Sequence, residues 1–242
     1  MNLKKNPEPL KMTNCSTKPW TKIAVDFFGP LTDGSEVLVI KDTHSKMVIA
    51  QEVKSTSCEN VLPVIESTIS LLGIPEQIKS DNGPPFNSHE FKEFCETFGM
   101  KHAPITPLHP ESNGQCEEFM KNMNKIVKNA RNGDRSWRSE LIAFLRSYRT
   151  TPHTSTGVAP SDLIFRHSNT SKLPKWYEIS NNEYKRLITK ALFTNRKAND
   201  TMKLNADRAR KAKFIKFEVD DFVLLDQVKN KKIHRSLGKL SV

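Results

Sequence analysis

Three acidic residues stand where a carboxylate could do more than carry surface charge. Asp26 interrupts an otherwise apolar segment, Asp81 precedes Asn82-Gly83, and Glu117 falls in a long amphipathic segment. Carboxylate oxygens without His or Cys are typical ligands of hard divalent cations such as Mg²⁺ or Mn²⁺. Each residue also has an ordinary explanation: Asp26 can face water from an edge strand, Asp81 can belong to a turn, and Glu117 can be a solvated helix residue. Considered one at a time, these ordinary explanations are the stronger ones.

Alternating and helical patterns predict the elements that carry these residues. Three strands are predicted first, the first of them around Asp26 and ending at Gly29-Pro30, and their short connections favour an antiparallel meander. A helix, a short strand ending before Asp81, a second helix, a last strand and two further helices follow, the first of which carries Glu117. This order predicts an α/β protein with a five-stranded mixed sheet flanked by helices. The expected segments are strands at 23–28, 36–41, 46–53, 77–79 and 101–105 and helices at 57–72, 88–98, 112–132 and 137–148.

The composition changes in the last third of the chain. Residues 183–213 form a basic segment with helical propensity, and residues 217–228 have strand character. We therefore expect an extended lead-in at 1–18, a core at 19–175, a basic helical linker at 176–216, and the start of a small C-terminal β domain at 217–242. The last segment is too short to close a small barrel, so an incomplete SH3-like segment is expected.

Charge indicates the class of partner. The formal net charge is +11, and residues 180–242 hold 16 Lys and Arg against 7 Asp and Glu. A near-neutral front followed by a basic tail favours a polyanionic partner, for which nucleic acid is the first choice and an anionic membrane surface the alternative. No apolar run is long enough to span a membrane. The four cysteines show no zinc or disulfide spacing, which favours reduced thiols in an intracellular protein.

The order and spacing of a larger set of residues identify a known family. Thirty-five residues separate Asp81 from Glu117, and distinctive flanking segments accompany them. The chain resembles the integrase catalytic core of gypsy-type LTR retrotransposons and retroviruses, and their domesticated relatives, over roughly Pro19 to Trp176. The matching residues are Trp20, 26–31 (DFFGPL), 42–46 (DTHSK), 73–75 (GIP), 80–86 (SDNGPPF), 109–117 (HPESNGQCE), Trp137, Tyr148, 153–160 (HTSTGVAP) and Phe165.

The resemblance implies a ribonuclease H-like fold in which Asp26, Asp81 and Glu117 converge as catalytic metal ligands. Like charges brought together repel, and divalent cations relieve that repulsion. The implied cofactor is a pair of Mg²⁺ or Mn²⁺ ions, and the implied reaction is 3′-end processing and strand transfer on DNA without a nucleotide cofactor. DNA is the implied partner, a homo-oligomer the implied assembly, and the nucleus the expected location. The candidate DNA contacts are Asn113, Gln115, Lys121 and Lys125.

Two departures from the family pattern keep other functions open. Glu118 follows Glu117, where the family usually has a basic residue, and it is a second candidate for the third ligand. The family's N-terminal His-His-Cys-Cys zinc domain is not found in these 242 residues. The alternative to an active integrase is therefore a domesticated or degraded DNA-binding protein that keeps the fold without catalysis. A related ribonuclease H or junction nuclease would share the metal chemistry but not the segments from Asp81 to Glu117.

Overall fold

The computed structural model describes residue 9 and residues 16–31, 33–104, 114–165, 179–212, 222–229 and 232–239. For residues 114–118 and for the last two segments, it describes the backbone only. Residues 12–200 form one compact unit, and residues 1–11 and 201–242 form a second. Within the described residues, no helix combines the length and the apolar character needed to cross a membrane.

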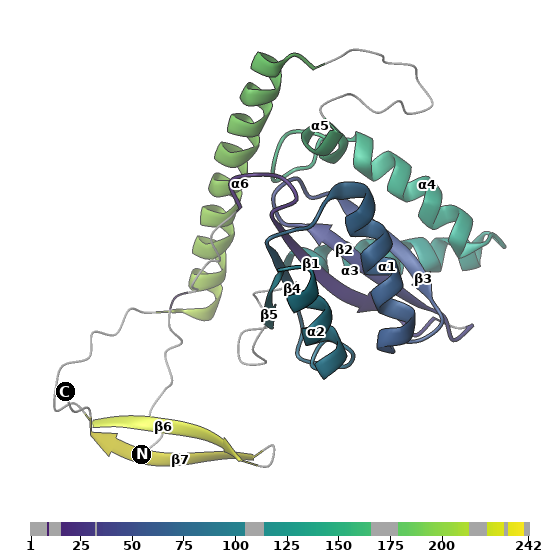
Figure 1. Cartoon of the computed structure of the whole chain (residues 1–242). Coiled ribbons are helices and arrows are strands. Elements are labelled where there is room, and N and C mark those ends of the chain that lie inside the picture. The colour runs from purple at the N-terminus through teal and green to yellow at the C-terminus, as the bar shows by residue number, and fades with distance from the viewer. Residues whose placement is uncertain are drawn as a thin grey trace. The chain divides into compact units, whose positions relative to one another are not determined.

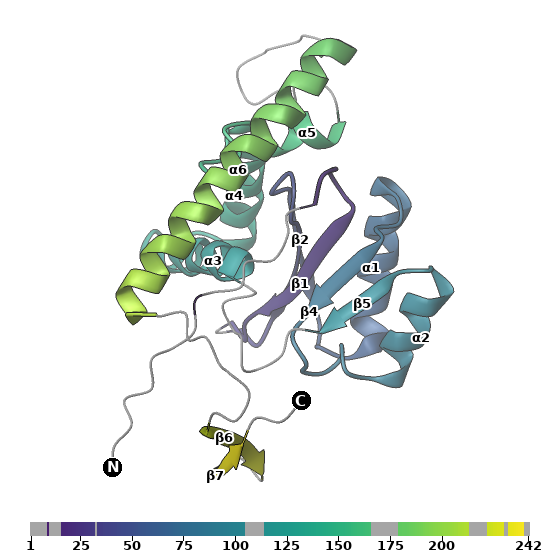
Figure 2. The same cartoon turned by 90° about the vertical axis from the view of Figure 1, so that its left-hand side faces the viewer.

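A mixed sheet of five strands forms the centre of the larger unit (Figures 1 and 2). Its strand order is β3-β2-β1-β4-β5, with β1 antiparallel to β2 and parallel to β4. The predicted meander is confirmed, because β2 is also antiparallel to β3. The strands are β1 (Lys22–Phe28), β2 (Glu36–Asp42), β3 (Val48–Val53), β4 (Gln77–Ser80) and β5 (Lys101–Pro104).

One face of the sheet is covered by helices α1 (Cys58–Leu72) and α2 (His89–Thr97). Ser88 caps α2 by accepting a hydrogen bond from the backbone N–H of Phe91. Side chains that alternate along the strands meet the apolar stripes of the two helices and exclude water. The fully buried members of this core include Ile23, Val25, Leu38, Ile40, Ile65, Ile78, Phe86 and Phe91.

Helices α3 (Gly114–Asn132) and α4 (Trp137–Thr150) cover the opposite face of the sheet (Figure 2). Phe119 and Met123 of α3 are buried against Val37 and Val39 of β2, and Leu141 of α4 belongs to the same core. The Phe119 ring also lies close to the rings of two α4 residues, Phe144 and Tyr148, with ring centroids 6.1 and 5.8 Å away. Alternate residues of β1 and β2 therefore belong to two separate cores.

Arg138, in the first turn of α4, contacts the segment before β2 and strand β3. Its guanidinium lies 4.4 Å from the centroid of the Trp137 ring, 3.2 Å from the Asp33 carboxylate, and in contact with both carboxylate oxygens of Glu52. Hydrogen bonds from Ser35, and then from Trp137, hold the pKa of Asp33 well below its ordinary value, and Arg138 adds to this effect. Because all of these groups reach solvent, the network fixes geometry more than it adds stability.

The rest of the larger unit consists of α5 (Pro160–Phe165) and the first part of the long helix α6 (Asn181–Arg210). Leu187, Ile188 and Ala191 of α6 pack against Val158 and Leu163. The Tyr184 hydroxyl donates a hydrogen bond of 2.8 Å to the carbonyl of Leu163. The smaller unit contains an antiparallel hairpin of β6 (Phe222–Lys229) and β7 (Lys232–Lys239).

The sequence predictions for the core helices and strands are confirmed with small shifts at their ends. Strand β3 begins at Val48 rather than at Lys46, because Lys46 adopts a turn conformation with a φ of 66°. The predicted strand at 217–228 is found from Phe222, and residues 217–221 lie outside the described ones. Helix α5 and strand β7 were not predicted. The β7 sequence KIHRSLGK is largely polar, so its pattern does not indicate a strand. An SH3-like fold for this segment and the proposed domain boundaries remain predictions.

Candidate functional site

Asp26 lies near the end of the central strand β1, on the face that α3 and α4 cover. Its neighbour across β2 is Val39, which belongs to the core under α3, whereas the adjacent Val25 belongs to the core under α1 and α2. The Asp26 side chain is partly exposed, and its Oδ1 accepts a hydrogen bond of 2.9 Å from the backbone N–H of Phe27. The carboxylate therefore lies at the margin of this core, and solvent reaches it.

Asp81 directly follows β4, the parallel neighbour of β1. The pairing of these strands matches Ile23 with Ile78 and Ala24 with Lys79, so continuing it by two residues aligns Asp26 with Asp81. Neighbouring strands are about 4.8 Å apart, and aligned residues of parallel strands project to the same face. The Asp81 side chain is exposed. By this register, the expected position of Asp81 is beside Asp26 on one face of the sheet, and the convergence of the two carboxylates stays a prediction.

Glu117 lies in the first turn of α3, the helix that packs over β1 on this same face. Phe119, two residues further along, is 1% exposed and anchors the beginning of α3 to the sheet. The side chains of Glu117 and Glu118 lie outside the described residues, so the choice between them remains a prediction. Among the side chains that are described, no three His, Cys, Asp or Glu gather where they could hold a metal ion.

The two aspartates are chemically suited to a hard cation. Both offer only oxygen donors, and their side chains reach solvent where a hydrated ion could enter. Ala24, two residues before Asp26 in β1, pairs with Lys41 of β2 and with Lys79 of β4. Lys41 is only 2% exposed. These positive charges border the carboxylates on the side toward the beginning of β1. The fit is that of Mg²⁺ or Mn²⁺ rather than of zinc, which favours His and Cys ligands.

The turn after β4 holds the Asp81 carboxylate close to the backbone. The N–H of Gly83 points to Asp81 Oδ1 at 3.3 Å, and a Cβ atom at position 83 would lie 3.1 Å from Asp81 Oδ2. Any larger residue at this position would therefore have to displace the carboxylate by a few tenths of an ångström. Gly83 thus lets the Asp81 carboxylate lie close to the backbone, whereas the sequence pattern Asp-Asn-Gly alone indicated only a turn.

Two polar side chains support this turn from the opposite face of the sheet. Ser80 is completely buried, and its hydroxyl donates a hydrogen bond of 2.8 Å to the backbone carbonyl of Asp81. His102 of β5 places its Nε2 2.8 Å from the same hydroxyl, and its ring lies edge-on to Phe91. Neither residue was singled out from the sequence. The sequence feature that could have indicated Ser80 is a serine at an alternating, buried position of the predicted strand, directly before the candidate ligand Asp81.

Burial gives His102 a pH-dependent effect on stability. Desolvation lowers its pKa below the ordinary value of 6.5, because the charged imidazolium is penalised inside the protein. The unfolded chain then binds this proton more readily than the folded protein. The stabilising effect of neutral His102 is present in full above about pH 6.5 and is lost as the pH falls below it.

We therefore expect His102→Gln to weaken the loss of stability on acidification. The free energy of unfolding, measured by urea denaturation at pH 7.5 and at pH 5.5, should differ less between the two pH values in the variant than in the wild type. The other histidines are the same in both proteins, so the comparison isolates His102. An unchanged pH dependence would show that His102 does not carry this effect.

The predicted DNA contacts are described only in part. Lys121 and Lys125 are exposed on α3, one turn apart and therefore on the same side of the helix. Gln115 is a residue of α3, but only its backbone is described. Asn113 lies outside the described residues altogether. The two lysines are accessible to a ligand, and all four DNA contacts remain predictions.

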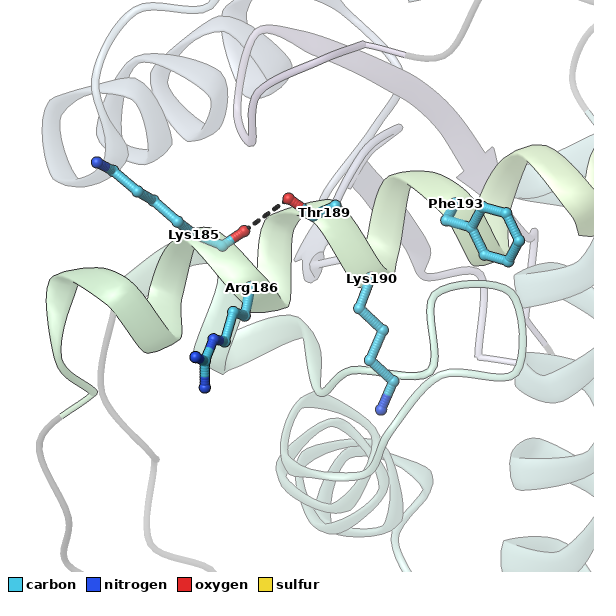
Figure 3. A pocket seen from close by; sticks show the side chains of 5 residues that line it. All are labelled: Lys185, Arg186, Thr189, Lys190 and Phe193. Carbon is cyan, nitrogen blue, oxygen red and sulfur yellow. Dashed lines mark hydrogen bonds between the residues drawn. The ribbon is translucent and has the colours of Figure 1, made fainter.

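A second basic surface lies on α6. A hollow of about 530 Å³ is bordered by Lys185, Arg186, Thr189, Lys190 and Phe193 (Figure 3). Arg186 and Lys190 extend from the same side of the helix, whereas Lys185 points away from them. Phe193, one turn further on, is 72% exposed. We call Arg186, Lys190 and Phe193 the α6 basic ridge, and its chemistry suits a phosphate backbone with an exposed base or sugar.

The segment Asp42–Lys46, part of the resemblance, has a structural role in the turn between β2 and β3. The buried Asp42 carboxylate accepts hydrogen bonds from the backbone N–H of His44 and from both the N–H and the hydroxyl of Ser45. The His44 Nδ1 lies 2.7 Å from the carbonyl of Ser16. Asp42 is therefore an acidic residue of a family motif that fixes a turn and lies apart from the candidate site.

Comparisons with known proteins agree with this architecture. Residues 16–110 match the family described as the integrase core domain. The uncharacterized protein K02A2.6 of Caenorhabditis elegans is 33% identical over 159 residues, which are 65% of this chain and 12% of that protein. The Gag-Pro-Pol polyprotein of human T-cell leukemia virus 2 is 42% identical over 92 residues, which are 38% of this chain and 6% of the polyprotein. The chain thus spans about an eighth or less of these relatives.

Solved structures share the fold. The simian T-cell lymphotropic virus intasome, solved in complex with the PP2A regulatory subunit B56 gamma, matches with a TM-score of 0.61 and 21% identity over 74% of this chain and 65% of that chain. The HTLV-2 integrase catalytic core domain, solved with magnesium in a trimeric form, matches with a TM-score of 0.51 and 23% identity over 61% of this chain and 97% of that chain. Residues 16–110 therefore match the integrase core domain family, and the larger unit shares the fold of these solved integrase structures, as predicted.

Proposed function

We propose that this protein is a DNA integrase, a polynucleotidyl transferase that cleaves DNA near a 3′ end and joins that end to a target strand. The proposal rests above all on one observation: β1 and β4 pair in parallel through Ala24 and Lys79, a register that would align Asp26 with Asp81 when it is continued by two residues. The resemblance of the sequence to integrase cores adds the expectation that Glu117, in the first turn of α3, is the third ligand. The related HTLV-2 core was solved with magnesium, which supports Mg²⁺ or Mn²⁺ as the cofactor.

In this function the carboxylates act as oriented ligands. Asp26 is held by β1 and by the N–H of Phe27, and Asp81 by the turn that Gly83 permits. Two divalent cations, when bound, would activate the attacking oxygen and stabilise the leaving oxygen of a phosphodiester. Lys121 and Lys125 would hold flanking phosphates without reading sequence.

Strand-transfer and disintegration assays on labelled DNA with Mn²⁺ test this function. Joined products from the wild type and none from Glu117→Gln would support catalysis. DNA binding without any metal-dependent product would support the second candidate function, a non-catalytic DNA-binding protein. The observation that favours this second function is the α6 basic ridge, which could bind DNA whether or not the carboxylates bind metal.

The α6 basic ridge predicts a specific change in the salt dependence of DNA binding. Each phosphate contact removed should reduce the slope of log K against log salt by roughly 0.9. The double variant Arg186→Ala/Lys190→Ala should therefore lower the slope by about 1 to 2 and weaken binding at low salt. Fluorescence anisotropy with a labelled duplex between 50 and 200 mM salt, a range suggested by the same dependence, measures both effects.

A matched control removes the same charge elsewhere. Lys92 and Lys101 are exposed, and neither belongs to α3 or α6. Lys92→Ala/Lys101→Ala should leave the slope nearly unchanged. If both double variants lowered the slope equally, net charge rather than the ridge would account for binding.

A further inference from the structure

The main-chain carbonyl of Asp81 is held from the face of the sheet that α1 and α2 cover. The hydroxyl of Ser80 donates to this carbonyl, and Ser80 is the completely buried last residue of β4. This bond fixes the plane of the peptide group that follows Asp81. The direction in which the chain leaves β4, and with it the direction of the Asp81 side chain, therefore depends on one buried hydroxyl.

His102 fixes the direction of that hydroxyl. A serine hydroxyl has a single proton, and here this proton is donated to the carbonyl of Asp81. The contact of 2.8 Å between the hydroxyl oxygen and His102 Nε2 must then be a hydrogen bond that the imidazole donates. His102 is itself fixed by its pairing with Ile78 across β4 and β5 and by the edge-on Phe91 ring, whose centroid is 5.0 Å away.

We propose that Ser80 and His102 are positioning residues, which hold Asp81 in the orientation that binds the divalent cation. The proposal rests on the proposed function, since it takes Asp81 to be a metal ligand. The chain of contacts runs from the α2 core through His102 and Ser80 to the backbone of Asp81, whose carboxylate receives a further N–H from Gly83. Groups that orient metal ligands in this way commonly change affinity without touching the metal.

Mn²⁺ binding to the full chain tests this role, measured from the electron paramagnetic resonance signal of the free ion. Ser80→Ala removes the hydroxyl and should weaken Mn²⁺ binding by about tenfold, within the range seen for supporting residues of metal sites. Ser80→Thr keeps a hydroxyl and should retain most of the affinity. His102→Phe removes the donor and should weaken binding, whereas His102→Gln keeps an amide N–H near the position of Nε2 and should restore part of it.

Controls separate this proposal from the proposed function and from a general loss of stability. Ser161→Ala removes another completely buried hydroxyl, in α5, and should leave Mn²⁺ affinity unchanged. Asp81→Asn should abolish binding, and if it did not, the proposed function itself would be wrong. If Asp81→Asn lost binding while Ser80→Ala bound Mn²⁺ as the wild type does, the positioning role would be overturned. Thermal denaturation of each variant confirms that the measured protein is folded.

Discussion

Replacing Asp81 by Asn is expected to reduce strand transfer roughly 10³-fold or more, as is common when a charged group that stabilises a transition state is lost. Asparagine keeps the size of the side chain and can still occupy the turn before Gly83. It lacks the negative charge that makes a carboxylate a stronger ligand of a divalent cation than a neutral amide oxygen is. Asp26→Asn and Glu117→Gln should have effects of similar size, because all three side chains are proposed to form one site.

The combined variants make this prediction sharper. Residues that act as a unit are not additive, so Asp26→Asn/Asp81→Asn should be no less active than either single variant within error. The assay is strand transfer on labelled DNA with Mn²⁺, with duplex affinity measured in parallel. DNA affinity should be nearly unaffected, since Lys121, Lys125 and the α6 basic ridge remain. If the loss of strand transfer in the double variant equalled the product of the losses in the two single variants, the two aspartates would act independently.

Glu118→Gln is the matched control on α3. One residue along a helix turns the side chain by about 100°, so Glu117 and Glu118 cannot both face the aspartates without a change of the helix. We expect Glu118→Gln to retain strand transfer and Glu117→Gln to lose it. The opposite result would assign the third ligand to Glu118 and leave the rest of the site as proposed.

The fold was predictable because its local patterns agree with its tertiary contacts. Ile23, Val25 and Phe27 alternate with Ala24, Asp26 and Phe28. The structure places the first set in the core under α1 and α2, and Phe28 of the second set in the core under α3 and α4. The strand β7 was missed because its stability comes from pairing with β6 rather than from its own sequence. Helix α5 has only six residues, which is too short for a periodic pattern to appear.

The candidate site was predictable only as a set of residue types and spacings. No pattern in the sequence reveals which residues of β1 and β4 lie side by side, because this register is a contact between distant segments. The same limit applies to Ser80 and His102, which are 22 residues apart and meet only because β4 and β5 are parallel neighbours. Buried Lys41 is a further case, since lysine in a strand is ordinarily read as an exposed residue.

Phe119→Ala is expected to destabilise the protein by about 3–5 kcal/mol, the usual cost of removing a fully buried aromatic ring. Phe119 is 1% exposed and packs between α4 and the sheet, where Phe144 and Tyr148 lie close to it. For a domain of this size the melting temperature should fall by roughly 6–20 °C. Leu71→Ala, on a side chain that is 81% exposed, should change the free energy of unfolding by no more than about 0.5 kcal/mol.

A second control distinguishes lost stability from lost positioning. Ile65→Ala removes a fully buried side chain of α1, in the core on the opposite face of the sheet, and should cost about 2–5 kcal/mol. Both variants are then compared at a temperature at which each is folded. Strand transfer per folded molecule should be near the wild-type value for Ile65→Ala and reduced for Phe119→Ala, because Phe119 anchors the turn of α3 that carries Glu117. Equal activity in the two variants would mean that α3 keeps its place on the sheet without this ring, held by Met123 and the α4 contacts alone.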